Sequence, residues 1–363
     1  MTVILSAAKD PVLVAPQRVT LKQGGGGRAM RALIEKLFIR EFAAMPFEGV
    51  GLAAMDDGAA IKLRSGSAAE GNGTDEWLII TTDSHVIHPI FFPGGDIGRI
   101  SVSGTVNDLA MMGATKILGI TCGVILEEGF PLDQLEAIQR SLVDTCVEAG
   151  TVVVTGDTKV MGRGEIDGIV INTTGIGLAP RVVRDNGLSV GDKLVVTGTI
   201  GDHGLAVMAA RHGLELEGNL ISDVAPINKL IKHALFELGD AITAMKDPTR
   251  GGLSSSLHEM AQKSKVGIVL EERRVPLTDA VRSTGEILGI DPLHVANEGK
   301  AVIGVRAEDA ERLVAVLREH PLGRDAAIVG TCIAERPGSI ILDTGFGRRL
   351  LAEPEGEPLP RIC

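Results

Sequence analysis

The stretch from Ser101 to Ile125, SVSGTVNDLAMMGATKILGITCGVI, sets the pattern that the first half of the chain follows. Its first part, Ser101–Met112, is rich in small and apolar residues and predicts a helix. Its second part, Ile117–Ile125, is an almost continuous apolar run and predicts a strand. A helix and a strand this close in sequence are expected to share one packed domain.

The same alternation continues on both sides of this stretch. After the glycines at 24–27, apolar residues at helical spacing predict a helix that extends to about Phe42. A further helix is predicted over Leu132–Ala149. The remaining strand-like runs of the first half are Ala59–Leu63, Trp77–Thr82, Val152–Thr155 and Ile169–Ile176.

A second block begins near Val182, and Pro180–Asp192 is the best candidate for a domain boundary. Its predicted strands are Lys193–Thr197, Gly267–Leu270 and Ala301–Val305, and its predicted helices are Gly204–Arg211, Pro226–Gly239, Gly252–Ser264 and Ala307–Leu317. We therefore expect an N-terminal arm over 1–22, one domain over 23–180, a second α+β domain over 181–346 and a tail over 347–363. The three prolines Pro354, Pro358 and Pro360 predict that this tail is exposed and semi-extended.

Composition excludes several classes of function. The formal net charge of −11 argues against nucleic acid as a partner, because phosphate-backbone binding requires a basic face. No run is long and apolar enough to span a bilayer, and the first residues lack the pattern of a secretion signal, so we expect a cytoplasmic protein with no membrane partner. The four cysteines lack metal or disulfide spacing, and we assign no metal to His85, His88 or His203.

The glycine run Gly24, Gly25, Gly26 and Gly27 precedes a predicted helix. Backbone N–H groups in such a loop can face an anion, and the dipole of the following helix assists. The run lacks the lysine of a P-loop, and a flexible hinge explains it about equally well.

Acidic residues recur where predicted strands and turns meet. They are Asp56 and Asp57 before a strand, Asp83 after one, Asp108 beside Asn107 in a helix of small residues, and Asp247 in the sequence KDPTRGG. Each alone is more often a turn or helix-cap residue. Together they suit a magnesium–nucleotide site, since Mg²⁺ takes hard oxygen ligands and substrate phosphates.

Other candidate reactive groups lie in turns. Asp157, Thr158 and Lys159 follow a predicted strand and offer a carboxylate, a hydroxyl and an ammonium in one tight turn. Arg250 can stabilise charge on a transferring phosphoryl group. Glu298 sits at a glycine turn, where it suits a general base, although a plain loop acid explains it as well.

Cys363 is the last residue, and it follows a proline-rich segment with no expected core contact. The segment from Arg349 to Cys363 can extend to about 50 Å at ~3.3 Å per residue. The thiol can therefore visit two distant sites, which predicts a swinging carrier arm.

Several long motifs of this sequence resemble those of a known protein family. FFPGGDIG at 91–98 and SGTVNDLAMMGA at 103–114 resemble the hydrogenase maturation proteins of the HypE family, as do ILEEGF at 125–130, Thr155–Val160, Asp247–Gly252 and the terminal PRIC. The wider superfamily resembles aminoimidazole ribonucleotide synthetase and selenophosphate synthetase. The resemblance covers nearly the whole chain from Gly24. One departure is Gln23, where many relatives have His.

The resemblance implies an α+β chain with a two-domain aminoimidazole ribonucleotide synthetase-like fold, a flexible C-terminal tail and a homodimer. It implies that a carbamoyltransferase, HypF, places a carbamoyl group on Cys363. It also implies that the chain itself is a carbamoyl dehydratase, which uses ATP and Mg²⁺ to convert this carbamoyl group to a thiocyanate. The cyanide then goes to the iron of [NiFe]-hydrogenase on the scaffold proteins HypC and HypD.

The resemblance also implies residue roles. Asp57, Asp83, Asp108 and Asp247 hold Mg-phosphates, with Asp56, Asn107 and Asp157 assisting. Lys159 and Glu298 face the docked Cys363, and Glu298 removes the proton.

Two other functions compete with this one. A sibling ATP-dependent synthetase of the superfamily needs the aspartates but not Cys363. A non-enzymatic thiol carrier needs Cys363 but no nucleotide.

Overall fold

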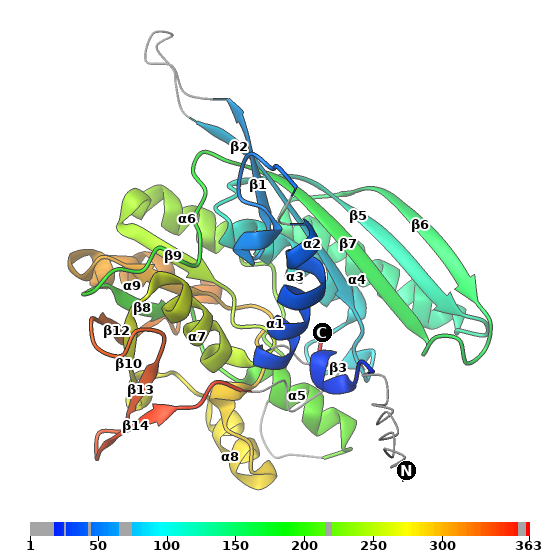
Figure 1. The fold of residues 1–363 in the computed structure, drawn as a ribbon. Coiled ribbons are helices and arrows are strands. Elements are labelled where there is room, and N and C mark those ends of the chain that lie inside the picture. The colour runs from blue at the N-terminus through cyan, green and yellow to red at the C-terminus, as the bar shows by residue number, and fades with distance from the viewer. Residues whose placement is uncertain (1–17, 25–26, 43–44, 65–74, 215–219, 355–360) are drawn as a thin grey trace, which may run out of the picture.

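Two large sheets and one short two-stranded sheet, with helices packed against the large ones, make up the described part of the protein (Figure 1). The structure, a computed structural model, describes all residues except 1–17, 25–26, 43–44, 65–74, 215–219 and 355–360. The five-stranded sheet has the order β1-β2-β7-β5-β6. Its strands are β1 (Ala59–Arg64), β2 (Glu76–His85), β5 (Lys116–Glu127), β6 (Val153–Met161) and β7 (Ile169–Ala179), and only the β5–β6 pair is parallel.

Helix α3 (Ile97–Met111) is buried along nearly its whole length and packs on β2, β7 and α4 (Leu132–Ala149). Its N-terminus is capped by Asp96, whose carboxylate accepts hydrogen bonds from the Gly98 and Arg99 amides at 2.7 and 3.0 Å. Gly98 permits the close contact with α4, because a Cβ there would lie 2.5 Å from the Ile138 carbonyl oxygen. The short hairpin of β3 (Phe91–Phe92) and β4 (Gly95–Asp96) leads into this cap.

The seven-stranded sheet has the order β14-β13-β10-β12-β8-β11-β9. Its strands are β8 (Lys193–Val196), β9 (Ile242–Lys246), β10 (Gly267–Glu271), β11 (Val302–Val305), β12 (Ala327–Ile333), β13 (Ile340–Asp343) and β14 (Arg348–Leu351). The helices of this half are α5 (Asp202–Arg211), α6 (Asn228–Leu238), α7 (Gly252–Ser264), α8 (Asp279–Leu288) and α9 (Ala310–Arg318). The α+β class with two domains is therefore confirmed.

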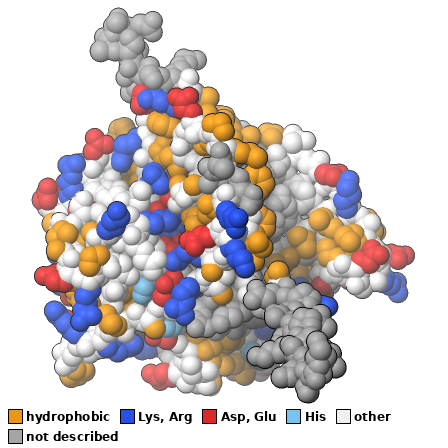
Figure 2. All heavy atoms as spheres, in the orientation of Figure 1, with side chains coloured by type: hydrophobic (Ala, Val, Ile, Leu, Met, Phe, Trp, Pro, Cys, Tyr) orange, Lys and Arg blue, Asp and Glu red, His pale blue; other side chains and the backbone are white. Residues whose placement is uncertain are grey.

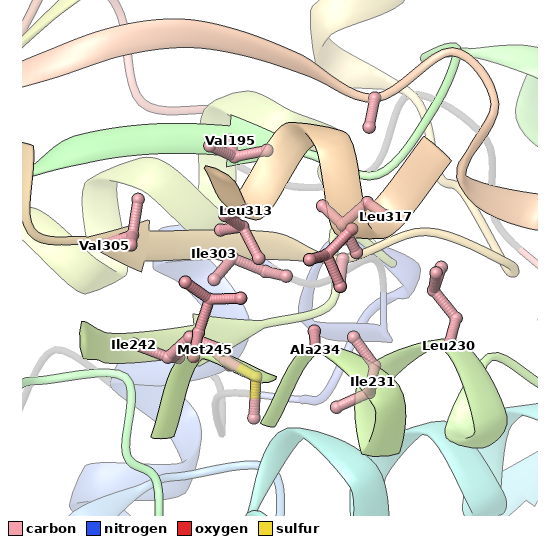
Figure 3. Close-up of a cluster of buried hydrophobic side chains, with 14 of the residues drawn as sticks. Val195, Leu230, Ile231, Ala234, Ile242, Met245, Ile303, Val305, Leu313 and Leu317 are labelled. Atoms are coloured by element: carbon pink, nitrogen blue, oxygen red, sulfur yellow. The ribbon is translucent and has the colours of Figure 1, made fainter. Parts of the chain in front are cut away.

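The two halves share a hydrophobic core. Figure 3 shows Leu313 and Leu317 of α9 facing Ile303 of β11 and Ala234 of α6. Ala110 and Met111 at the end of α3 belong to the same buried cluster. Because α3 is also the main helix on the first sheet, it fixes one half against the other.

Most of the predicted elements are present, with α4 and α7 spanning the predicted residues. Sequence analysis missed α8, β9, β12, β13 and β14. It was also wrong to place a tight turn at 155–159, because these residues lie inside β6. The glycine and aspartate there favoured a turn, but parallel pairing with β5 overrides that local preference.

The tail also begins later than predicted. Residues 348–351 form β14, which pairs antiparallel with β13, and the terminal residues 361–363 pack against the protein. At the other end, the predicted first helix begins at Gly27 as α1 (Gly27–Ile34) and continues through a π-helical turn, Glu35–Ile39, into α2 (Arg40–Phe42).

Figure 2 shows charged side chains of both signs interspersed on the face that it presents, with hydrophobic side chains gathered over β1 and the α1–α2 segment. Among the described residues, no helix is both long and apolar enough to cross a bilayer.

Candidate active site

A cavity of about 640 Å³ lies where α1, β2, α3, α7 and the end of the chain meet. This volume is typical of small-molecule sites, which hold roughly 300–1,000 Å³. Its lining is unusually rich in acidic side chains, and it includes nine of the predicted site residues: Gly27, Asp56, Asp57, Asp83, Asp108, Asp247, Arg250, Glu298 and Cys363.

Four aspartates reach the cavity from four separate segments. Asp57 precedes β1, Asp83 lies within β2, Asp108 is on α3 and Asp247 follows β9. Alternation along β2 puts Thr81, Asp83 and His85 on one face of the strand. The Thr81 hydroxyl lies 2.8 Å from Asp108 Oδ2, which links β2 to α3 at the cavity wall.

Burial, together with mutual repulsion, raises the pKa values of two of these acids. Burial, followed by the charges of Asp83, Asp247 and Asp57, raises the pKa of Asp108 well above its usual value. Burial and the charge of Asp57 raise the pKa of Asp247 to about 8. Without a counter-charge the cavity therefore holds protons at neutral pH.

This donor set fits a hard cation, because carboxylates that repel one another are stabilised by positive charge between them. Within the described part of the chain, no group of three or more His, Cys, Asp or Glu side chains is arranged closely enough to enclose a metal by itself. A bound Mg²⁺ would need oxygen ligands from elsewhere, which suits an ion that usually keeps water and phosphate ligands.

The buried Lys246 and the half-buried Lys263 hold the acidic loop before β1 in place. Lys246 forms an ion pair with Asp57, and its ammonium lies 3.4 Å from Glu259. Burial opposes the charged form of Lys246, but the surrounding carboxylates outweigh it and raise its pKa well above the usual value. Lys263 contacts Asp185 at 2.6 Å and Asp56 at 3.3 Å.

Asp56 also accepts a hydrogen bond from Arg184 at 2.6 Å. The Asp56 carboxylate thus forms ion pairs with Arg184 and Lys263. Within this chain, these ion pairs stabilise the loop before β1. Local sequence patterns carry no signal for Lys263 or Glu259, since both are ordinary polar positions of a helix.

Helix α1 covers the cavity from the other side. Arg31 contacts Glu259 of α7 at 3.1 Å and Glu353 at 3.0 Å. Gly27, at the start of α1, lines the cavity, whereas Gly24 ends a short 3-10 turn and is not part of the lining. Gly25 and Gly26 lie outside the described residues, so the predicted anion-binding loop stays a prediction.

The C-terminus is docked into the molecule, and its last residue lines the cavity. The amides of Val86 and His88 donate to the oxygens of Cys363 and Arg361 at 3.0 and 3.2 Å, which is an antiparallel pairing pattern. Ile362 is 1% exposed and joins a core cluster. The prediction that this end has no core to pack against was therefore wrong.

His203 fixes the docked tail. Its Nε2 lies 2.8 Å from the Ile362 carbonyl oxygen, which can only accept, so Nε2 carries the proton. Its Nδ1 then accepts from the Ser222 hydroxyl, 2.8 Å away. Burial lowers the pKa of His203 and keeps the ring neutral. Sequence analysis assigned His203 no role, because its partner is 159 residues away in the chain.

Glu298 lies in the cavity lining, and its Oε1 is buried without a hydrogen-bond partner. Burial, then Asp247 and Asp223, raise its pKa well above the usual value. In this cavity the neutral form of Glu298 is therefore favoured relative to an exposed glutamate.

Four other predicted residues lie elsewhere. Asp157, Thr158 and Lys159 are on the exposed edge strand β6, where Lys159 pairs with Asp157 at 2.8 Å. Asn107 is buried and does not line the cavity. The Asn107 side-chain NH2 donates hydrogen bonds to the carbonyl oxygens of Ala225 and Glu298, and its Oδ1 accepts one from the Ile227 amide. Asn107 therefore joins the two halves of the chain.

The chain matches two family models, the N-terminal domain of AIR synthase related proteins over residues 55–179 and the C-terminal domain over residues 189–343. A putative hydrogenase expression/formation protein of Methanocaldococcus jannaschii is 47% identical over 95% of this chain and 100% of its own. The carbamoyl dehydratase HypE of Rhizobium leguminosarum is 40% identical over 100% of both chains.

Solved structures agree with these relatives. A HypE–HypF complex contains a chain 41% identical to this one, with a TM-score of 0.79, covering 89% of this chain and 100% of that one. The hydrogenase maturation protein HypE in complex with ATP is 40% identical with a TM-score of 0.76, covering 94% and 99%.

The two matched domains and the cavity between them define the class of AIR synthase related proteins. The full-length identities go further, and the chain belongs to the HypE family of hydrogenase maturation proteins.

The raised pKa of Asp247 gives a pH dependence that can be measured. The folded protein holds a proton on Asp247 up to about pH 8 and the unfolded chain loses it near pH 4, so stability falls as pH rises between these values. Asp247→Asn should remove a slope of about 1 kcal/mol per pH unit from the free energy of unfolding between about pH 5 and 7.

Urea unfolding at several pH values measures this slope. Asp144→Asn, at an exposed site on α4, controls for the loss of one negative charge. Parallel stability–pH curves for wild type and Asp247→Asn would contradict the proposed proton uptake.

Proposed function

We propose that this protein is an ATP-dependent carbamoyl dehydratase that converts a carbamoyl group on Cys363 to a thiocyanate, the source of cyanide for the iron centre of [NiFe]-hydrogenase. One observation carries the proposal. The terminal cysteine is docked in the same cavity as Asp57, Asp83, Asp108 and Asp247. A sibling synthetase has no need to bring its own chain end there.

The chemistry explains why one cavity must hold both groups. The oxygen of a thiocarbamate, S–C(=O)–NH2, is a poor leaving group until it is phosphorylated. Transfer of the γ-phosphoryl group of ATP to that oxygen, with loss of one N–H proton, makes it a leaving group. Departure of phosphate with loss of the second N–H proton leaves S–C≡N. Water must be kept out, because it would hydrolyse the activated group.

The aspartates are suited to hold the phosphates of ATP through Mg²⁺, which would neutralise the developing phosphoryl charge. Gly27 and the start of α1 border the same space, where helix N–H groups favour an anion. The structure of a HypE chain in complex with ATP, 40% identical to this one, supports nucleotide binding here.

The partners follow from the same proposal. The HypE–HypF complex supports HypF, a carbamoyltransferase, as the enzyme that loads Cys363. Transfer of cyanide to iron on HypC and HypD, and a cytoplasmic location, complete the proposal.

Intact-protein mass spectrometry tests the function directly. After incubation with carbamoyl phosphate, HypF and ATP, the chain should gain one carbamoyl group and then lose one water. Omitting ATP should stop the reaction at the carbamoyl adduct, and Cys363→Ala should prevent both changes. An unmodified chain beside demonstrably active HypF would point to the sibling synthetase, and conversion without nucleotide would point to a thiol carrier.

Glu298 is proposed as the base that removes a proton from the carbamoyl nitrogen. Burial and nearby acids raise the pKa of Glu298, which favours its protonated form. Positive charge among the aspartates would lower that pKa and make the carboxylate available when substrate is present. Arg250 is proposed to assist at the phosphoryl group, whereas Lys159 lies on β6 outside the cavity that holds the thiol.

Glu298→Gln should leave the carbamoyl adduct to accumulate and slow dehydration by about 10²–10⁴-fold, the usual contribution of general base catalysis. Mass spectrometry separates the adduct from the thiocyanate, and Glu311→Gln, an exposed position on α9, is the matched control. If the Glu298→Gln variant dehydrates the carbamoyl group at the normal rate, Glu298 is not the base.

We also propose a homodimer formed through the first domain. Strand β6 is an edge of the five-stranded sheet, and all of its residues are exposed in the single chain. Exposed apolar side chains on it include Val154 and Val160, at 58% and 67%. Unpaired, apolar edge strands are normally covered. A second copy on β6 would cover these valines and place Lys159 at an interface.

Light scattering tests this arrangement. The wild-type protein should have the mass of two chains, and Val154→Lys with Val160→Lys should reduce it to one. Val190→Lys, at a position exposed to 60% in the second domain, should leave the dimer intact. A wild-type mass of one chain at working concentration would contradict the proposal.

A further inference from the structure

A four-residue segment, 222–225, holds the main chain of Glu298 from both sides. The Glu298 amide donates to Asp223 Oδ1 at 3.0 Å, and the Glu298 carbonyl oxygen accepts from the Ala225 amide at 3.4 Å. The approach is so close that only glycine fits after Glu298, since a Cβ at Gly299 would lie 2.0 Å from the Asp223 carbonyl oxygen. The position of the Glu298 main chain is therefore set by this segment.

The same segment holds the histidine that fixes the tail. The Ser222 hydroxyl lies 2.8 Å from His203 Nδ1, and His203 Nε2 lies 2.8 Å from the Ile362 carbonyl oxygen. The Ser222 amide donates to the Pro93 carbonyl oxygen at 2.8 Å, which anchors the segment on the β3–β4 hairpin. One short piece of backbone therefore positions both the docked tail and the loop that carries the proposed base.

The carboxylate of Asp223 is buried, which is unusual for a residue that only holds a loop. The Asp223 side chain is 3% exposed, and its Oδ2 accepts no hydrogen bond from the described residues. The ammonium of Lys300 lies 3.3 Å from this oxygen. A neutral serine or asparagine could accept a hydrogen bond from the Glu298 amide without the cost of burying a charge. The hydrogen bond alone thus does not account for the negative charge.

The charge of Asp223 acts on Glu298. After burial, the charges of Asp247, Asp223 and Asp83 raise the pKa of Glu298. Arg250 opposes them. Asp247 and Asp83 line the cavity, where a cation with nucleotide phosphates would offset their charge, but Asp223 is not part of the lining. Its charge therefore persists when the cavity is occupied, and a base with higher proton affinity removes a proton from a weak acid more readily.

We propose that Asp223 is a positioning residue for the base, because it holds the Glu298 main chain at a fixed place relative to the docked tail and keeps a negative charge beside it. The inference rests on the proposed function for the role of Glu298 as the base. Asp223 lies outside the cavity lining, so it acts through Glu298 rather than on the substrate.

Single-turnover dehydration tests the positioning. The chain is loaded with a carbamoyl group by HypF, purified and mixed with ATP, and mass spectrometry follows the loss of water. Asp223→Ala removes the acceptor for the Glu298 amide and should slow dehydration about tenfold to a hundredfold, the effect of a misplaced catalytic group. Asp223→Asn keeps an acceptor oxygen and should lose much less. Asp144→Asn, at an exposed site on α4, should match the wild type.

The pH dependence separates this role from a purely structural one. The base must be ionised, so the rate falls as pH falls through the pKa of Glu298. Removing the charge of Asp223 lowers that pKa, so the acid limb of the rate should move to lower pH in Asp223→Asn. A folding defect would lower the rate at every pH without moving the limb.

Infrared spectroscopy follows the same proton without turnover. The C=O stretching band of a protonated carboxyl group that is present in the wild type and absent from Glu298→Gln reports Glu298. Its pH midpoint requires neither nucleotide nor a carbamoyl group. The midpoint should be lower in Asp223→Asn than in the wild type and unchanged in Asp144→Asn.

Dehydration by Asp223→Ala at the wild-type rate would overturn the positioning. An acid limb and an infrared midpoint that are the same in the wild type and Asp223→Asn would overturn the role of the charge. If the infrared midpoint shifts but the loaded wild-type chain never loses water, Asp223 acts on Glu298 as inferred and the proposed function fails. If the wild type dehydrates and both Asp223 variants behave like it, the proposed function stands and this inference fails.

Discussion

Burial of several like charges around one cavity is the constraint on which this structure depends. Asp108 and Asp247 come from different halves of the chain, and the charge of Asp247 helps to raise the pKa of Asp108. Carboxylates this close are tolerated only if they bind protons, face a cation or are held by rigid neighbours. The surrounding structure provides cations for the loop that carries Asp57, because Lys246 pairs with Asp57 and Lys263 pairs with Asp56 and Asp185.

Helix α3 connects that constraint to the fold. Asn107 uses its amide to bind the backbone of the second half at Ala225, Ile227 and Glu298, and the next residue, Asp108, faces the cavity. One turn of helix therefore joins the halves and presents an acid between them. A shift of one half against the other would change the spacing between Asp108 and Glu298, so the charge distribution of the cavity and the packing of the halves are coupled.

The acidic positions could be predicted from the sequence, because aspartates near strand ends and turns are visible in local patterns. Prediction failed where a distant partner decides the outcome. Residues 155–159 look like a turn and become β6 through pairing with β5. His203 looks like an ordinary core histidine until Ile362 lies beside it. Lys263 has no local signal, since its role is set by Asp56 and Asp185. Contacts between residues far apart in the chain leave no periodic pattern in the local sequence from which they could be predicted.

The energetics of the docked tail suit a carrier. Burying Ile362 contributes about 2 kcal/mol, and the few hydrogen bonds to the last three residues contribute about 1 kcal/mol each. Ordering three residues costs about 1–2 kcal/mol for each backbone, and more for the side chains. These gains and costs nearly cancel, so the docked and released tail are close in free energy. Strong side-chain recognition would hold the tail permanently, whereas contacts to main-chain oxygens would let the proposed carrier thiol leave for loading and return to the cavity.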